Sequence, residues 1–240
     1  MIIRGVTLSG VGFVIDQQPI VTSNLQLYLD AANTTSYPGT GTTWYDLSGN
    51  SNNVTMQNSG SITYSSTGGG YFSTGSNGYF NKSSTTNIPT GNTSYTLSAW
   101  VQWGTSWPGA GGIIGIGNGY GTSNAVNAFR SIGSPNGLNN YWWGNDLSGT
   151  SSLSPANQWF NAVATYDGTT RRIYVNGSQI TSGATTGHNV TSSYLTIGLT
   201  WPTQNEYLQG NIGQALIYDR ALTTAEIAQN YAATRVRYGV

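Results

Sequence analysis

Apolar and polar residues alternate along much of the chain with the period of two that is typical of half-buried β-strands. In the run 94–103, one face carries Tyr95, Leu97, Ala99 and Val101, and the other carries Ser98, Trp100 and Gln102. Shorter β-prone runs, such as 25–30, 113–116, 125–131 and 194–199, recur between turns rich in Gly, Asn and Asp. This pattern predicts a protein built mainly from short strands.

Two dipeptides predict that neighbouring strands run antiparallel. Asp167-Gly168 and Asn176-Gly177 each separate two β-prone runs, and dipeptides of this kind favour the positive-φ turns of β-hairpins. No repeat of 20 to 50 residues and no linker interrupts the pattern. We therefore expect an all-β fold, an antiparallel β-sandwich, formed by a single domain.

One short helix is expected near the C-terminus, over about residues 223–234. Thr223 and Glu226 have the spacing of a capping box, in which each side chain accepts a hydrogen bond from the other residue's backbone N–H. Leu222 and Ile227 have the spacing of a hydrophobic staple. Ile227 and Tyr231 then share one face, which we expect to dock on the sandwich.

The composition narrows the classes of partner. The 240 residues include no cysteine, and eight basic residues balance eight acidic ones, so disulfides, thiolate chemistry and an extended basic surface for nucleic acid are absent. No run approaches the ~18 apolar residues of a membrane-spanning helix. Gly, Ser, Thr and Asn fill nearly half of the chain, but 8 Trp, 16 Tyr and 5 Phe favour a folded protein over a disordered one.

The residues that catalyse hydrolysis are sparse, so no enzyme is expected. Glycosidases use two carboxyl groups that flank the scissile bond, whereas the only glutamates are Glu206 and Glu226, and the capping box accounts for Glu226. The single histidine, His188, lies in a stretch that is typical of a surface loop. The glycine-rich run 115–121 matches neither the dinucleotide nor the phosphate-binding pattern.

Aromatic residues beside amides and hydroxyls are the best candidates for a binding surface, because rings can stack on sugars while polar groups bond the sugar hydroxyls. Alternation cannot bury Tyr141, Trp142 and Trp143 on one face, so at least one ring points away from its neighbours. The candidate ligand-binding residues are Trp107, Trp142, Trp143 and Trp201. The alternative is that these rings pack in the core or beneath loops, as we expect for Trp44, Trp100 and Trp159.

The segment 46–53 resembles a calcium loop in its alternating oxygen-bearing side chains. Asp46 and Asn50 are its candidate ligands. One carboxylate is fewer than a tight calcium site uses, and an Asx turn at Asp46 explains the same residues and is favoured. We expect no other cofactor.

Several short motifs together resemble laminin-G-like, concanavalin A-like jelly-roll domains. The opening motifs are 27–31, 37–39 and 44–50, the central strand is 95–101, the paired hairpins are 159–168 and 173–177, and the closing strand and helix span 210–231. The resemblance covers about residues 24 to 238. The resemblance implies a two-sheet antiparallel sandwich that binds ligands, in some relatives with calcium. The hydrolase members carry closely spaced Glu and Asp on one strand, and this chain lacks that pattern.

The resemblance also suggests a biological setting. Versions with the Tyr37-Pro38-Gly39 opening and the ending 233–239 look like domains of phage and marine bacterial structural proteins. We therefore expect a non-enzymatic virion structural protein, a capsid decoration or fibre at the virion surface, that binds virion proteins or its own copies through an apolar N-terminal arm, residues 1–22. The jelly-roll domain would span 23–240, and host glycans are possible further partners. The alternative is a secreted, extracellular carbohydrate-binding module.

Overall fold

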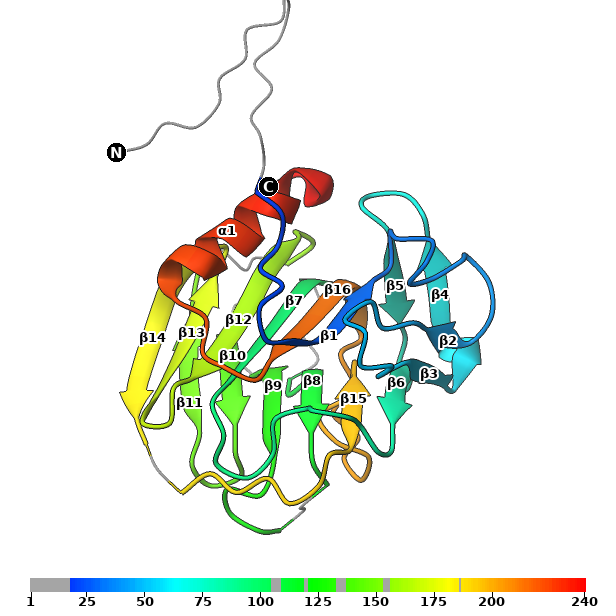
Figure 1. Cartoon of the computed structure of the whole chain (residues 1–240). Coiled ribbons are helices and arrows are strands. Elements are labelled where there is room, and N and C mark those ends of the chain that lie inside the picture. Colours follow the sequence, from blue (N-terminus) through cyan, green and yellow to red (C-terminus); the bar gives the residue numbers. More distant parts are fainter. Residues whose placement is uncertain (1–17, 105–108, 119–120, 133–136, 153–155, 186) are drawn as a thin grey trace, which may run out of the picture.

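A computed structural model describes residues 18–104, 109–118, 121–132, 137–152, 156–185 and 187–240. Sixteen strands in this part of the chain form two antiparallel sheets, shown in Figure 1 with the single α-helix lying across one of them. The predicted antiparallel β-sandwich is confirmed, and so is its division into two sheets. No helix in the described ranges is long and apolar enough to cross a membrane.

In sheet A the two hairpins form one side, out to the edge, and the closing strand lies next to the central strand. Its strand order is β14 (Ser178–Ala184), β13 (Thr170–Val175), β12 (Phe160–Tyr166), β7 (Tyr95–Trp103), β16 (Gly210–Tyr218), β5 (Tyr71–Thr74) and β4 (Ile62–Ser65), and β1 (Leu25–Asp30) also pairs with β16. Asp167-Gly168 and Asn176-Gly177 connect β12 to β13 and β13 to β14, as their sequence predicts. Gly168 and Gly177 both have positive φ, and so does Asn176.

Sheet B packs against sheet A and contains mostly shorter strands. Its order is β11 (Leu147–Thr150), β10 (Gly137–Tyr141), β9 (Asn127–Ser131), β8 (Gly112–Ile116), β15 (Leu195–Ile197), β6 (Tyr79–Lys82), β3 (Val54–Gln57) and β2 (Thr43–Trp44). A single 3-10 turn, η1 (Ser59–Ser61), precedes β4.

The core between the sheets follows the alternation in the sequence. Leu97, Ala99 and Val101 of β7 face the same apolar layer as Phe160 and Ala162 of β12, and all are fully buried. The β7 residues on the opposite face lie on the outside of sheet A. Burial of this apolar layer stabilises the sandwich at about 25 cal/mol for each Å² removed from water.

The helix α1 (Thr224–Thr234) covers part of the outer face of sheet A. Its capping box is formed as predicted, with Thr223 as the N-cap. Ile227 is buried with Leu216 and Leu222, and Tyr231 stacks on Trp100 with ring centroids 5.8 Å apart. The chain then continues into a second 3-10 turn, η2 (Arg235–Tyr238). The docking of the helix through the Ile227 and Tyr231 face is confirmed.

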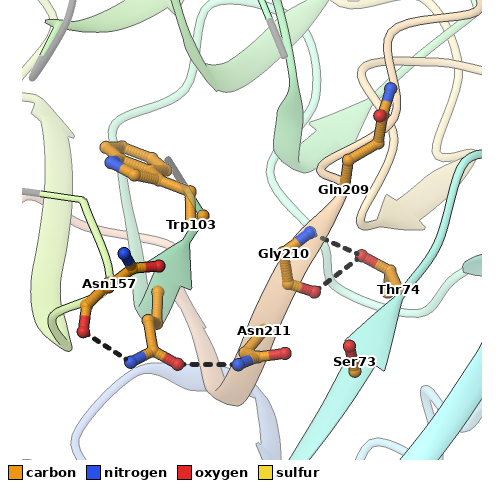
Figure 2. A pocket seen from close by; sticks show the side chains of 9 residues that line it. Ser73, Thr74, Trp103, Asn157, Gln209, Gly210 and Asn211 are labelled. Carbon is orange, nitrogen blue, oxygen red and sulfur yellow. Dashed lines mark hydrogen bonds between the residues drawn. The ribbon is translucent and has the colours of Figure 1, made fainter. Parts of the chain in front are cut away.

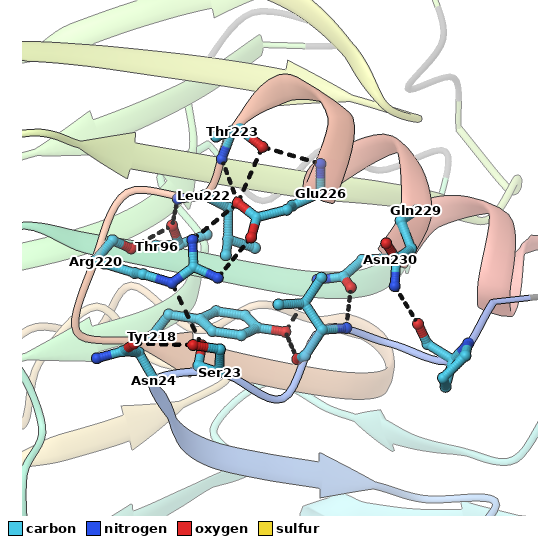
Figure 3. Close-up of polar contacts among 12 residues, drawn as sticks. Ser23, Asn24, Thr96, Tyr218, Arg220, Leu222, Thr223, Glu226, Gln229 and Asn230 are labelled. Carbon is cyan, nitrogen blue, oxygen red and sulfur yellow. Dashed lines mark hydrogen bonds and ion pairs between the residues drawn. The ribbon is translucent and has the colours of Figure 1, made fainter. Parts of the chain in front are cut away.

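Residues 19–21 are attached to the folded domain. The backbone N–H of Val21 donates to Asn230 Oδ1 at 2.8 Å, and the Val21 carbonyl accepts from the Tyr218 hydroxyl at 2.8 Å. Gln229 donates to the Pro19 carbonyl at 2.7 Å (Figure 3). The last residues of the predicted arm therefore contact the sandwich, and the boundary after residue 22 stays a prediction. Residues 1–17 of the predicted arm lie outside the described residues.

Candidate functional site

The aromatic run at the end of β10 is divided between the two faces of sheet B. Tyr141 lies on the outer face with Trp143 and Trp201, and their ring centroids are 5.3 to 6.0 Å apart. Trp142 points the other way, into the core. The expectation that one ring of this run points away from its neighbours is confirmed, and two of the predicted binding residues, Trp143 and Trp201, do lie together.

Trp142 is a core residue and cannot stack on a ligand. Its ring is fully buried and lies on the His188 ring, with centroids 3.9 Å apart and planes 6° apart. Its indole N–H donates to the Tyr95 hydroxyl at 3.0 Å, and the Arg171 guanidinium lies 3.9 Å from the ring centroid. The prediction of ligand contact is wrong for this residue, because the strand alternation turns it inward.

His188 is likewise not the surface residue that its sequence context suggests. Only 3% of it is exposed, and its Nε2 lies 3.3 Å from the Val126 carbonyl oxygen. Burial lowers the pKa of His188 to about 4, and the nearby charge of Arg171 lowers it further. The imidazole is therefore neutral near pH 7 and serves as an aromatic core residue.

Trp201 is also buried, because its segment lies across the outer face of sheet B. Its ring stacks on Tyr141 at an interplanar angle of 15°, and 1% of the residue is exposed. A Cβ atom on Gly112 or Gly115 would overlap the Thr200 backbone, so only glycine lets this segment lie directly on β8. For Trp201 the prediction of direct ligand contact is wrong in this structure.

The charges beside these rings neutralise one another. Arg130 lies over Tyr141, 3.7 Å from the ring centroid, and its Nη1 is 2.7 Å from Glu206 Oε2. Trp143 remains half-buried at the edge of this cluster. Trp107, the fourth predicted residue, lies outside the described residues. Among the predicted tryptophans that the structure describes, Trp143 is therefore the one that is partly exposed to solvent.

The described carboxylates are engaged separately, and none forms a pair with another. Four form ion pairs: Asp30 with Arg237, Asp167 with Arg172, Glu206 with Arg130, and Glu226 with Arg220. Asp46, Asp146 and Asp219 accept hydrogen bonds instead. Figure 3 shows how Glu226 accepts from both Arg220 and the Thr223 backbone. Hydrogen bonding to Arg220 lowers the pKa of Glu226 to about 2.

The Asp46 loop is held by hydrogen bonds within the protein. Asp46 Oδ1 accepts from the backbone of Tyr28 and Ser48, and its Oδ2 accepts from the Asn52 backbone at 2.9 Å and from the Ser48 hydroxyl. Asn50 turns its amide N–H toward the Gln26 carbonyl and Oε1. Within the described residues, no three His, Cys, Asp or Glu side chains lie close enough to hold a metal. This geometry is that of the Asx turn, and calcium binding at Asp46 and Asn50 stays a prediction.

A polar pocket of about 240 Å³ lies where β5 and β7 end and β16 begins (Figure 2). Its lining residues are Ser73, Thr74, Gln102, Trp103, Gly104, Asn157, Gln209, Gly210 and Asn211. None of them carries a charge. The lining offers four side-chain amides and two hydroxyls, groups that can both donate and accept hydrogen bonds.

The amides of this pocket are held in a row. Gln102 Nε2 donates to the backbone carbonyl of Asn157 at 2.9 Å, and Asn211 Nδ2 donates to Gln102 Oε1 at 2.7 Å (Figure 2). Thr74 donates its hydroxyl to the Gly210 carbonyl at 3.0 Å. Because Gln102 is held from both sides, the side-chain amide of Asn211 that donates to it is set in place, and its carbonyl oxygen is available to a ligand.

The sequence analysis missed this pocket, although one signal for it was present. The alternation in residues 94–103 already places Gln102 on the face away from the core. The other lining residues come from segments that are far apart in sequence, at residues 73–74, 157 and 209–211. The antiparallel pairing of β16 with both β5 and β7 brings residues 73–74 and 209–211 to Gln102, whose side chain bonds the Asn157 backbone.

Comparison with solved structures shows the same fold in several binding domains. The binding domain of Paraclostridial Mosquitocidal Protein 1 is 14% identical, with a TM-score of 0.64 over 88% of this chain and 52% of that one. Domain 4 of AbnA, a GH43 extracellular arabinanase from Geobacillus stearothermophilus solved with arabinotriose, is 16% identical, with a TM-score of 0.62 over 87% of this chain and 98% of that one. These identities show the fold alone.

An enzyme also contains this fold. Trypanosoma rangeli sialidase is 16% identical, with a TM-score of 0.68 over 91% of this chain. The present chain spans about a third of the sialidase and about half of the mosquitocidal binding domain. A search of curated proteins gives no match to the sequence.

The family model for Laminin_G_3, described as the concanavalin A-like lectin/glucanases superfamily, matches residues 73–228. This range contains most strands of both sheets, the lining of the polar pocket and the first turn of α1. The chain therefore belongs to the Laminin_G_3 family of the concanavalin A-like lectin/glucanases superfamily.

Proposed function

We propose that the protein is a non-catalytic module that binds neutral carbohydrate in the polar pocket of sheet A. The observation that carries this proposal is the lining itself, which consists of amides, hydroxyls and backbone groups without a charged side chain. Each sugar hydroxyl can both donate and accept a hydrogen bond, and a side-chain amide provides an N–H donor and a carbonyl acceptor for it. The absence of charge in the lining favours neutral sugars over sialic or uronic acids.

The comparisons support a binding role. Two of the similar solved structures are binding domains of toxins, and a third is a domain of an arabinanase in complex with arabinotriose. The pocket volume of about 240 Å³ is below the roughly 300–1,000 Å³ of pockets for drug-sized ligands. A single sugar unit, rather than a branched glycan, matches this size.

The test is isothermal titration calorimetry, which measures the affinity for neutral sugars such as arabinotriose and cellotriose, with and without calcium. Gln209→Ala removes an exposed amide of the pocket and should weaken binding. Gln179→Ala removes another exposed amide, on β14 and outside the pocket, and should not. If neither sugar binds, or if both variants bind like the wild type, the pocket is not the site. Release of reducing sugar that is lost in Glu206→Gln would contradict a non-catalytic role.

A structural role in a virion is the second candidate function. Pro19 lies beside α1, where its carbonyl accepts from Gln229, and the sequence of residues 2–15 is rich in apolar positions. Such a segment could add to a partner's sheet or to a second copy of the chain. In this proposal the protein lies at the virion surface, whereas a secreted carbohydrate-binding module would lie outside the cell. Mass spectrometry of purified particles decides between the two, because only the virion protein should be found in them.

A further inference from the structure

The polar row of the pocket continues across the outer face of sheet A. Ser73 of β5 is paired with Asn211 of β16, and Asn211 is paired with Gln102 of β7. The backbone carbonyl of Asn157 extends the row beyond β7, because it accepts a hydrogen bond from the Gln102 side chain. These four residues therefore form one line that crosses three neighbouring strands.

Two half-buried aromatic residues stand next to this line. Tyr71 lies two residues before Ser73 on β5, so both side chains are on the outer face of the sheet. Trp159 follows Asn157 by two residues. The rings of Tyr71 and Trp159 approach each other at an angle of 62°, with centroids 5.6 Å apart. The two ends of the polar row are thus joined by an aromatic pair.

Trp159, one ring of this aromatic pair, rests on the C-terminal segment and is held in position by it. Trp159 packs on Tyr238 with ring centroids 4.8 Å apart, and Tyr238 in turn stacks on Trp100 at 4.4 Å. A Cβ atom on Gly213 would overlap the Tyr238 hydroxyl, so the glycine on β16 gives this ring its place. Because Tyr238 is buried, the underside of Trp159 is fixed before any ligand arrives.

We infer that Tyr71 and Trp159 form a second subsite, which extends the pocket so that the protein binds a neutral oligosaccharide rather than a single sugar. This inference rests on the proposed function. The pocket amides bond the hydroxyls of one sugar unit, and the aromatic pair covers the apolar face of the next. Binding then requires no rearrangement of the Trp159 ring, since packing on Tyr238 already fixes it.

The inference predicts an affinity that rises with the length of the sugar. Wild-type protein is titrated with the series from arabinose to arabinotetraose and with gluco-oligosaccharides of the same lengths. Tyr71→Ala should lower the affinity for the trisaccharide and tetrasaccharide by roughly tenfold, which corresponds to about 1.4 kcal/mol, and leave the monosaccharide affinity unchanged. Gln209→Ala should weaken binding at every length.

Three further variants separate binding from stability. Trp159→Phe keeps a ring on Tyr238 and should reduce both the affinity for long sugars and the change in tryptophan fluorescence when they bind. Tyr45→Ala is the matched control, because Tyr45 is 44% exposed and is not among the pocket residues. If Tyr71→Ala melts below the wild type, Tyr71→Leu replaces it in the titrations.

The outcomes distinguish this inference from the proposed function. If no sugar of either series binds the wild type, both fail. If sugars bind and Gln209→Ala weakens them, but the variants at Tyr71 and Trp159 bind every length like the wild type, the pocket stands and the aromatic subsite does not exist. An equal loss at all lengths in Tyr71→Ala would also overturn the second subsite, because it would place the ring in the first.

Discussion

Trp142 and His188 lie ring on ring in the core, 3.9 Å apart and nearly parallel. The Arg171 guanidinium is 3.9 Å from the Trp142 ring centroid and is itself buried. A proton on His188 would add a second positive charge beside this guanidinium. The stability of the fold should therefore depend on pH.

We predict that stability falls as the pH is lowered from about 6.5 to about 4. The pKa of His188 is lowered to about 4 in the folded protein, from an ordinary value of 6.5. Between these values the unfolded chain takes up a proton that the folded chain does not, so unfolding is favoured. Above pH 6.5 both states are neutral at this residue and its effect disappears.

Urea unfolding between pH 7.5 and 4.5 measures this effect. Glu226 has its pKa lowered to about 2 from 4.5, so its own contribution is lost mainly below pH 4.5. His188→Gln provides the control, since it removes the titrating group and should flatten the slope in this range. An unchanged slope in that variant would show that another group is responsible.

The tryptophans of the aromatic runs should differ sharply in their effect on stability. Trp142 and Trp201 are buried, so their replacement by alanine should cost roughly 3–5 kcal/mol. Trp143 is half-buried at the edge of its cluster, so Trp143→Ala should cost less. Chemical denaturation of the three variants checks this order, and an equal loss in all three would contradict the difference in burial.

The strand pattern predicted the fold well because alternation and hairpin dipeptides are local signals. The run 94–103 shows its core face directly in the sequence, and the capping box at Thr223 and Glu226 fixes the start of the helix. Both depend on residues within a few positions of each other. The structure confirms both the strand and the capping box, and neither prediction needed knowledge of contacts between distant parts of the chain.

The site was harder to predict, because it depends on which strands become neighbours. Trp142 and Trp143 are adjacent in sequence but lie on opposite faces, and no local signal says which of them is buried. Trp201 is covered because its segment crosses β8, a contact that the glycines at 112 and 115 permit. His188 appears polar in sequence, yet its burial follows from a stack with a residue 46 positions away.

The start of the domain can be located by two deletions. Deletion of residues 1–17 keeps the described contacts of Pro19 and Val21 and serves as the reference. Deletion of residues 1–23 removes the hydrogen bonds of Val21 with Asn230 and Tyr218, and it uncovers apolar surface of the cluster beneath α1. We expect a clearly lower melting temperature for the longer deletion. Equal melting temperatures would support the predicted boundary after residue 22.

The segment over sheet B should be sensitive to a single methyl group. Gly112 and Gly115 have negative-φ or extended backbone, so alanine is tolerated by the backbone itself, but its Cβ would overlap Thr200 in either position. Because backbone atoms cannot move aside as a flexible side chain can, the segment that carries Trp201 must shift. Overpacking of this kind typically costs about 1–3 kcal/mol.

Gly115→Ala should therefore lower the free energy of unfolding and uncover Trp201 from Tyr141, which increases acrylamide quenching of tryptophan fluorescence. The shift should also separate Arg130 from Glu206, since Glu206 lies in the same segment. Gly60→Ala is the matched control, because a Cβ atom there meets nothing within 4 Å. If Gly115→Ala unfolds at the same urea concentration as Gly60→Ala and shows no added quenching, the segment does not lie against β8 in solution.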